Sequence, residues 1–261
     1  MARAILIAVT AGYLGLFLIA PFAAMLVAAF GKGLAFFAAA VADVETIESG
    51  LLTLLVVAIV VPLNTLFGLA AAWSIGKFEF RGKQTLIALI DVPYAVSPVV
   101  AGLVFVLVLG HNSVLGSWLE AHGLRVIFAT PGLILATLFV TFPIVARELV
   151  PLFESQERDE EEAALLLGAS GWQTFLRVTL PNAKWGVLYG VVMCAARAAG
   201  EFGAVSVVSG HIRGETTTLP LHVEILYNEY NMAGASAVAS LVAAIGLLTL
   251  VMKGFFKRSP D

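Results

Sequence analysis

The chain has 261 residues, of which 60% are hydrophobic and only 13% are charged, and its mean hydropathy is +0.96. Soluble domains contain about 45–50% apolar and about 25% charged residues, so this composition excludes an ordinary soluble protein and indicates an integral membrane protein. The net charge of −3 argues against a nucleic-acid-binding protein, because no part of the chain is strongly basic.

Six stretches are long and apolar enough to cross a bilayer as helices, since a crossing needs about 20 mostly apolar residues. Helices are expected because lipid offers the backbone no hydrogen-bond partner. The predicted spans are residues 4–30, 50–76, 85–110, 127–150, 185–209 and 235–252, with the last continuing towards Phe255 and Phe256. We predict one all-α transmembrane domain over residues 1–261. Its first span is expected to be retained, because its apolar run is longer than the about 7–15 residues of a secretory signal. The small residues around Ala20 to Ala24 leave a cleaved signal open as the alternative.

The basic residues of the connections predict the orientation. Eleven lie before the first span, between the second and third, between the fourth and fifth, or after the sixth, whereas the alternate connections hold only Lys32, Arg125 and Arg213. Lysine and arginine concentrate on the cytoplasmic side of membrane proteins. We therefore predict that both termini and the connection at residues 151–184 are cytoplasmic.

The third span contains Pro93 and Pro98, which predict a kink, because proline removes a backbone donor and clashes with the preceding turn. Asp91 lies towards the cytoplasmic end of the same span. It is interpreted as an acid at the membrane interface.

The connection at residues 151–184 holds six acids within nine positions, from Glu154 to Glu162, in a chain otherwise poor in charge. Acids early in a helix favour the positive end of its dipole, and the block turns apolar at residues 163–167. A helix is therefore predicted here, ended by Gly168 in the left-handed conformation.

A second short helix is predicted directly after Gly168. Ser170 and Gln173 have the spacing of a capping box at its start. Pro181 is expected to end it, because proline disfavours helix in the residue before it, and Asn182 is expected to cap the fifth span. The connection is thus predicted to form a helix, a sharp turn and a helix, with an apolar patch beside an acidic flank.

The spacing within this connection resembles the cytoplasmic docking loop of permease subunits in ATP-binding-cassette importers. The matching positions are Glu162, Ala163, Ala164, Gly168, Leu180 and Pro181. The resemblance implies that these residues couple the chain to a separate ATPase. A charge run alone more often marks an ordinary solvated loop, so the interpretation depends on the complete spacing.

The fifth span carries an ion-pair candidate, Arg197 and Glu201, because residues four apart share one face of a helix. Charged residues inside membranes usually face a bundle interior or an aqueous path. The pair either fixes helix packing or lines a conduction path, where Arg197 could help an anion pass. Gly200 and Gly203 permit close helix approach or a local break in the helix. Phe202 is a candidate plug, although packing is the commoner role of an aromatic residue.

Catalytic and cofactor-binding patterns are missing from the sequence. No P-loop of the form Gly, four residues, Gly-Lys-Ser/Thr is found. The four histidines, expected at the surface, lack metal-ligand spacing. We therefore predict no catalytic, metal or cofactor site in this chain.

Two other functions are weaker alternatives to an importer subunit. A channel or secondary transporter would need its own coupling-ion chemistry. A membrane enzyme would need a nucleophile with a base inside the spans.

The stretch from Ala198 to Asn231 resembles a particular family. It reads Gly200-Glu-Phe-Gly-Ala-Val-Ser-Val-Val-Ser-Gly-His-Ile-Arg-Gly214, followed by Thr218-Leu-Pro-Leu-His-Val-Glu-Ile-Leu-Tyr-Asn-Glu-Tyr-Asn231. Together with Ser97-Pro-Val-Val-Ala-Gly102, it is similar to the CysW-type membrane subunits of sulfate/thiosulfate importers. Glu-Phe-Gly is shared with molybdate permeases, so the part of the stretch from His211 to Asn231 distinguishes the sulfate family from them.

This resemblance implies a type I importer permease fold in the bacterial inner membrane. It also implies a related second permease subunit, two ATPase subunits that bind ATP and Mg²⁺, and an external binding protein that delivers the anion. Sulfate, thiosulfate and molybdate or tungstate remain open as the solute.

Overall fold

The computed structural model describes residues 2–256, and every regular element in that range is a helix. In chain order the elements are α1 (Ala2–Leu14), the π-helical turn η1 (Gly15–Ile19), α2 (Ala20–Phe30), α3 (Leu34–Val41), α4 (Val44–Lys77), α5 (Lys83–Ala95), α6 (Pro98–Leu109), α7 (Val114–Ala121), α8 (Thr130–Ser155), α9 (Asp159–Leu166), α10 (Gly171–Thr174), the π-helical turn η2 (Phe175–Thr179), α11 (Leu180–Ala199), α12 (Gly203–Ser209), α13 (Leu219–Asn228) and α14 (Met232–Phe256). The all-α prediction is confirmed.

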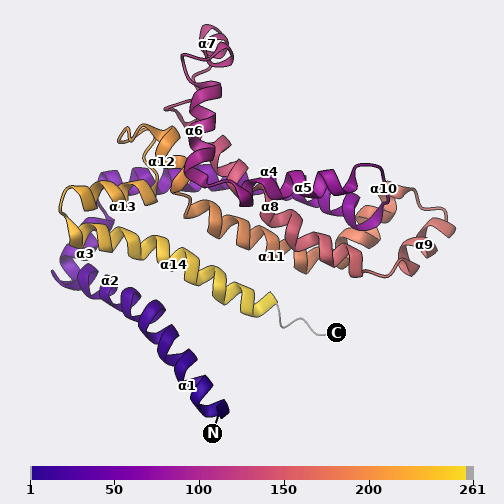
Figure 1. Ribbon diagram of the computed structural model, residues 1–261, viewed down its shortest axis with the longest axis horizontal. Helices are drawn as coiled ribbons and strands as arrows, with labels where there is room; N and C mark the ends of the chain where they lie inside the picture. The colour runs from indigo at the N-terminus through magenta and orange to yellow at the C-terminus, as the bar shows by residue number, and fades with distance from the viewer. Residues whose placement is uncertain (1, 257–261) are drawn as a thin grey trace.

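The long helices run side by side along the molecule. Helices α4 and α8 form the most extensive pair, and α11 packs against both of them. Figure 1 shows α1 leading away from the other helices, while α6 and α7 project from the bundle and α9 with α10 lie at one end of it. The predicted connection at residues 151–184 thus forms one end of the bundle.

Four helical runs are long and apolar enough to cross a membrane: Ile5–Phe30, Val44–Lys77, Thr130–Ser155 and Met232–Thr249. They correspond to the first, second, fourth and sixth predicted spans. Helix α4 begins six residues before the predicted boundary, because Asp43 caps it by accepting a hydrogen bond from the Glu45 N–H at 3.1 Å. Helix α14 reaches Phe256, as expected from the apolar sequence there.

The third and fifth predicted spans are broken helices. Helices α5 and α6 meet at 102°, and the run from α10 through α11 meets α12 at 49°. Counting each bent pair as one span gives six. In the third span Pro93 stays inside α5, and the chain bends at residues 96 and 97, because Pro98 keeps the preceding residue extended. The prolines predicted a kink but not so sharp a bend.

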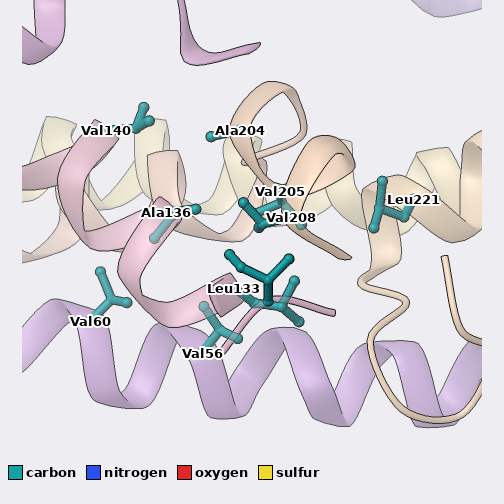
Figure 2. Close-up of a cluster of buried hydrophobic side chains, with 11 residues drawn as sticks. Val56, Val60, Leu133, Ala136, Val140, Ala204, Val205, Val208 and Leu221 are labelled. Atoms are coloured by element: carbon teal, nitrogen blue, oxygen red, sulfur yellow. The ribbon is translucent and has the colours of Figure 1, made fainter. Parts of the chain in front are cut away.

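The main core joins α4, α8, α12 and α13. Figure 2 shows side chains from these helices pointing towards one another around Leu133, which is fully buried. Val56 and Val60 come from α4, and Val205 and Val208 from the short helix α12. The broken end of the fifth span therefore contributes to this core, and α12 packs chiefly against α6 and α8.

His222 departs from the expectation that the histidines lie at the surface, because it is buried in α13. Its Nε2 lies 3.1 Å from the Thr46 hydroxyl oxygen, which itself donates to the Ala40 carbonyl at 2.9 Å. The Thr46 hydroxyl can therefore only accept from the ring, so Nε2 carries the proton. Burial lowers the pKa of His222 below its ordinary value.

Candidate functional site

The loop with the acidic block has the local structure that its sequence predicts around Gly168. Gly168 has a φ of +88°, and it follows α9 directly. Its N–H donates to the Leu165 carbonyl and the Ala169 N–H to the Ala164 carbonyl, each at 3.0 Å. This is the Schellman ending of a helix, which favours glycine at the left-handed position.

The predicted capping box is also present. Ser170 Oγ accepts from the Gln173 N–H at 3.3 Å, and the Gln173 side-chain oxygen accepts from the Ser170 N–H at 2.8 Å. Two consecutive backbone devices therefore fix the sharp reversal between α9 and α10.

Two boundaries of the predicted loop are wrong. Helix α8 continues through Pro151 to Ser155, so Glu154 belongs to α8 and only the acids from Asp159 onwards open α9. Pro181 does not end the second helix. The π-turn η2, in which the Leu180 N–H donates to the Phe175 carbonyl, leads directly into α11, with Pro181 in its first turn. The helix therefore continues past Pro181, with the π-helical turn directly before it.

The turn after α9 exposes an apolar tip, which we define as Leu165, Leu166, Leu167 and Trp172. Leu166 and Leu167 are 89% and 88% exposed, and Leu165 and Trp172 are also exposed. Glu162, Ala163 and Gly168 lie exposed next to this tip, while Ala164 is half-buried. The part of the docking motif on α9 therefore surrounds an apolar surface that this chain leaves uncovered.

The other part of the motif lies at the start of α11, where Leu180 is half-buried and Pro181 exposed. Two acids outside the motif tie it to α9. Asn182 Nδ2 donates to Glu160 Oε2 at 2.5 Å, and Thr179 Oγ1 donates to Glu161 Oε1 at 2.7 Å. Asn182 was expected to cap α11 but bonds across the loop instead. Sequence reasoning treated the acids as one solvated flank and missed this division of roles.

Glu161 also forms an ion pair with Lys77, the last residue of α4, at 3.2 Å. The Lys77 side chain is only 4% exposed. A lysine at the end of a span is usually read as a residue of the membrane interface, so only the packed structure shows its partner in α9.

The second group of predicted residues lies at the break between α11 and α12. Arg197 Nη1 donates to Glu201 Oε2, and Glu201 Oε1 accepts from the Ala204 N–H at 2.9 Å. The predicted pair is thus confirmed, but the helical-face reasoning is wrong, because α11 ends at Ala199 and Glu201 lies in the break. There its carboxylate also satisfies a free donor in the first turn of α12.

The two members of this pair differ in burial. The Glu201 side chain is 1% exposed, whereas that of Arg197 is 43% exposed. Arg197 lines a cavity of about 330 Å³ together with Tyr94, Pro98 and Glu148. The cavity lies beside the bend between α5 and α6, so the two broken spans meet around the guanidinium group.

Phe202 and Gly203 lie next to the pair but face other surroundings. Phe202 lines a separate apolar groove with residues of α13 and α14, among them Val223, Tyr227 and Ala239. It therefore does not plug the Arg197 cavity. A Cβ atom at position 203 would lie 3.0 Å from Cβ of Pro98. Gly203 thus allows α12 to approach the start of α6 closely.

Another charged cluster near this cavity was missed in the sequence. Arg147 of α8 pairs with Asp91 of α5, with 2.8 Å between Nε and Oδ1, and its guanidinium lies 4.6 Å from the centre of the Tyr94 ring. Asp91, interpreted from the sequence as an interfacial acid, therefore joins α5 to α8.

The chain is similar to proteins of known classification. Residues 65–259 match the family described as binding-protein-dependent transport system inner membrane component. The CysW sulfate transport permease of Escherichia coli K12 is 50% identical over 92% of this chain and 82% of its own length, and that of Synechococcus elongatus is 52% identical over 97% and 88%. The CysT sulfate permease of Escherichia coli K12 is 36% identical over 72% of this chain and 68% of its own length.

The fold is also found among solved structures. A crystal structure of a bacterial alginate ABC transporter, in complex with an alginate-bound periplasmic protein, contains a chain that superposes with a TM-score of 0.81. The two chains are 18% identical, and the match covers 98% of this chain and 93% of that one. This similarity supports the assignment of the fold, and it carries no information about the transported solute.

Proposed function

Because this chain belongs to the family of binding-protein-dependent transport system inner membrane components, we propose that it is a CysW-type permease subunit of an ATP-driven sulfate importer. The observation that carries the proposal is the identity of 50–52% with CysW sulfate permeases across more than nine-tenths of the chain. Thiosulfate is a further expected solute, and molybdate or tungstate the alternative.

The proposed complex contains a second permease subunit, two ATPase subunits and an external binding protein. Two observations support this composition. The chain is 36% identical to a CysT permease, which suits a pseudo-symmetric pair of related subunits. It also has the fold of a transporter chain solved with its periplasmic protein. ATP and Mg²⁺ would be bound by the ATPases.

The apolar tip beside Gly168 is proposed to dock into the ATPase. Leu166 and Leu167 are almost fully exposed at the end of the bundle that is predicted to be cytoplasmic. Exposed leucines of this kind suit an apolar groove on a partner protein. Closure of the ATPases would then move α9, and α9 would move the helices to which it is tied.

Arg197 is proposed to contact the dianion as it passes. Its guanidinium is partly exposed towards the cavity, whereas Glu201 is held in the break by the Ala204 N–H. A fixed carboxylate keeps the charge of the empty cavity balanced. Arginine offers several donors in one plane, which suits an oxyanion.

The proposal is tested with the reconstituted complex in vesicles. We expect uptake of labelled sulfate that requires ATP, the ATPase subunits and the binding protein. Excess thiosulfate should compete with the label, and molybdate should compete weakly. Strong competition by molybdate would favour the alternative solute, and uptake by the isolated subunit would contradict the importer assignment.

A further inference from the structure

The structure assigns a coupling role to Lys77 that goes beyond the docking motif: we propose that Lys77, Glu161 and Thr179, here called the Lys77 cluster, transmit movement of α9 to the membrane helices. This inference rests on the proposed function, since it concerns how ATP hydrolysis reaches the transport path. All three residues lie outside the six positions of the motif.

The geometry of the Lys77 cluster joins three helices at one carboxylate. Glu161 Oε1 lies 3.2 Å from Lys77 Nζ and accepts the Thr179 hydroxyl at 2.7 Å. Lys77 ends α4, Glu161 lies in the first turn of α9, and Thr179 directly precedes α11. The side chains of Lys77 and Glu161 are 4% and 18% exposed, so solvent screens this pair less than a surface pair.

The end of α4 also contacts both ends of the short linker between α8 and α9, residues 156–158. Lys77 Nζ lies 3.5 Å from the Gln156 carbonyl oxygen, and the Lys77 carbonyl accepts from Arg158 Nη2 at 3.1 Å. A displacement of α9 therefore acts directly on the end of α4. Helix α4 in turn packs along α8, and α8 contributes Glu148 to the lining of the Arg197 cavity.

An aromatic row makes a second connection over the same path. Trp172 of the apolar tip stacks on Phe175 with 5.5 Å between ring centres, and Phe175 contacts Trp73 of α4 at 4.6 Å. The row holds the tip near α4 by packing. The Lys77 cluster instead holds α9 itself. The rings of the aromatic row, Trp172, Phe175 and Trp73, all lie outside α9. Losing the cluster should thus loosen α9, with Leu165 and Leu166, while the aromatic row still holds Trp172 near α4.

The test compares ATP hydrolysis with sulfate uptake in the full complex. Lys77→Met keeps the length of the side chain and removes its charge. We expect the number of ATP molecules hydrolysed per sulfate to rise about tenfold, which corresponds to roughly 1.4 kcal/mol of coupling free energy. Lys83→Met is the matched control, because Lys83 pairs with the exposed Glu79 four residues away, and it should leave this ratio unchanged.

A charge swap separates coupling from simple loss of structure. The double variant Lys77→Glu/Glu161→Lys restores an opposite pair, and we expect it to recover much of the lost coupling. If Lys77→Met does not accumulate in the membrane, Thr179→Val removes only the hydroxyl donor and should raise the ratio about twofold to threefold. An unchanged ratio in an accumulated Lys77→Met or Thr179→Val complex, or no recovery by the swap, would overturn the inference. Absence of sulfate uptake by the wild-type complex would instead refute the proposed function.

Discussion

Helix α9 and the break after α11 both contain acids, yet the two sets of acids lie in opposite surroundings. In α9 the acids begin an exposed helix, and the conformation of Gly168 decides where the apolar tip lies. In the break a single carboxylate, Glu201, is buried and balanced by one guanidinium, Arg197. At the break, substitutions should therefore act mainly through charge balance. At the turn, they should act mainly through backbone geometry.

The largest effect is expected for Arg197→Ala, because it removes the guanidinium partner of the buried Glu201 carboxylate and leaves its bond from the Ala204 N–H. Breaking a buried ion pair costs about 3–5 kcal/mol, and the partial exposure of Arg197 reduces this figure. We expect ATP-driven sulfate uptake to fall about 30-fold to 100-fold, since about 1.4 kcal/mol corresponds to tenfold.

The double variant Arg197→Ala/Glu201→Ala sharpens this prediction. It removes both charges, so uptake should recover in part relative to Arg197→Ala. The deficit that persists relative to wild type then measures the contact between Arg197 and the anion. If the double variant takes up sulfate no faster than Arg197→Ala, charge balance does not explain the effect of substitutions at the break.

The next largest effect is expected for Gly168→Asp at the turn. A residue other than glycine in the left-handed conformation costs roughly 1–2 kcal/mol, and the new charge would lie beside the apolar tip. Uptake should fall about tenfold while the subunit still inserts and the ATPases still hydrolyse ATP. Gly171→Asp places the same charge in the first turn of α10 without a positive φ. Equal loss in both variants would show that charge and not conformation matters here.

A smaller effect is expected for Gly203→Val, which forces α12 away from Pro98. Overpacking of this kind costs about 1–3 kcal/mol, so the melting temperature of the purified subunit should fall and uptake should drop about fivefold. Gly200→Ala is the matched control three residues away, where a Cβ would meet only the Ala196 carbonyl oxygen at 3.7 Å. Similar destabilisation by both would contradict the close approach of α12 and α6.

The smallest effect concerns His222, whose pKa burial lowers below the ordinary value of 6.5. The unfolded chain binds a proton as the pH falls below about 6.5, while the buried imidazole stays neutral. The contribution of the neutral, buried His222 to the free energy of unfolding is therefore fully present above about pH 6.5 and is lost as the pH falls below it. Melting temperatures measured from pH 8 to pH 5 should decline less in His222→Gln than in wild type. The exposed His122→Gln should follow wild type, and an identical decline in all three would exclude His222 as a cause.

Local signals in the sequence predicted the local structure well. The left-handed Gly168 and the Ser170–Gln173 capping box follow from rules that involve a few neighbouring residues, and both are present. Apolar runs likewise located the long helices. The docking role of the six motif positions remains a prediction.

The features that sequence analysis missed depend on contacts between distant segments. Lys77 and Glu161 are 84 positions apart in the numbering, and nothing in either local pattern marks them as partners. Glu201 appeared to continue a helix, because Arg197 and Glu201 have helical spacing, whereas α11 ends at Ala199. His222 lies in a connection between predicted spans, and it is buried because α13 packs against α14 and α4.

The central claim, that the turn after α9 is gripped by a separate ATPase in the cytoplasm, is tested most directly by cross-linking from Leu166→Cys. The native thiol, Cys194, is buried and should not react. In the assembled complex, a short cross-linker supplied on the cytoplasmic side should join position 166 to the ATPase subunit, and a membrane-impermeant reagent supplied outside should not label it. Labelling from the outside, or no cross-link in a complex that imports sulfate, would contradict the account.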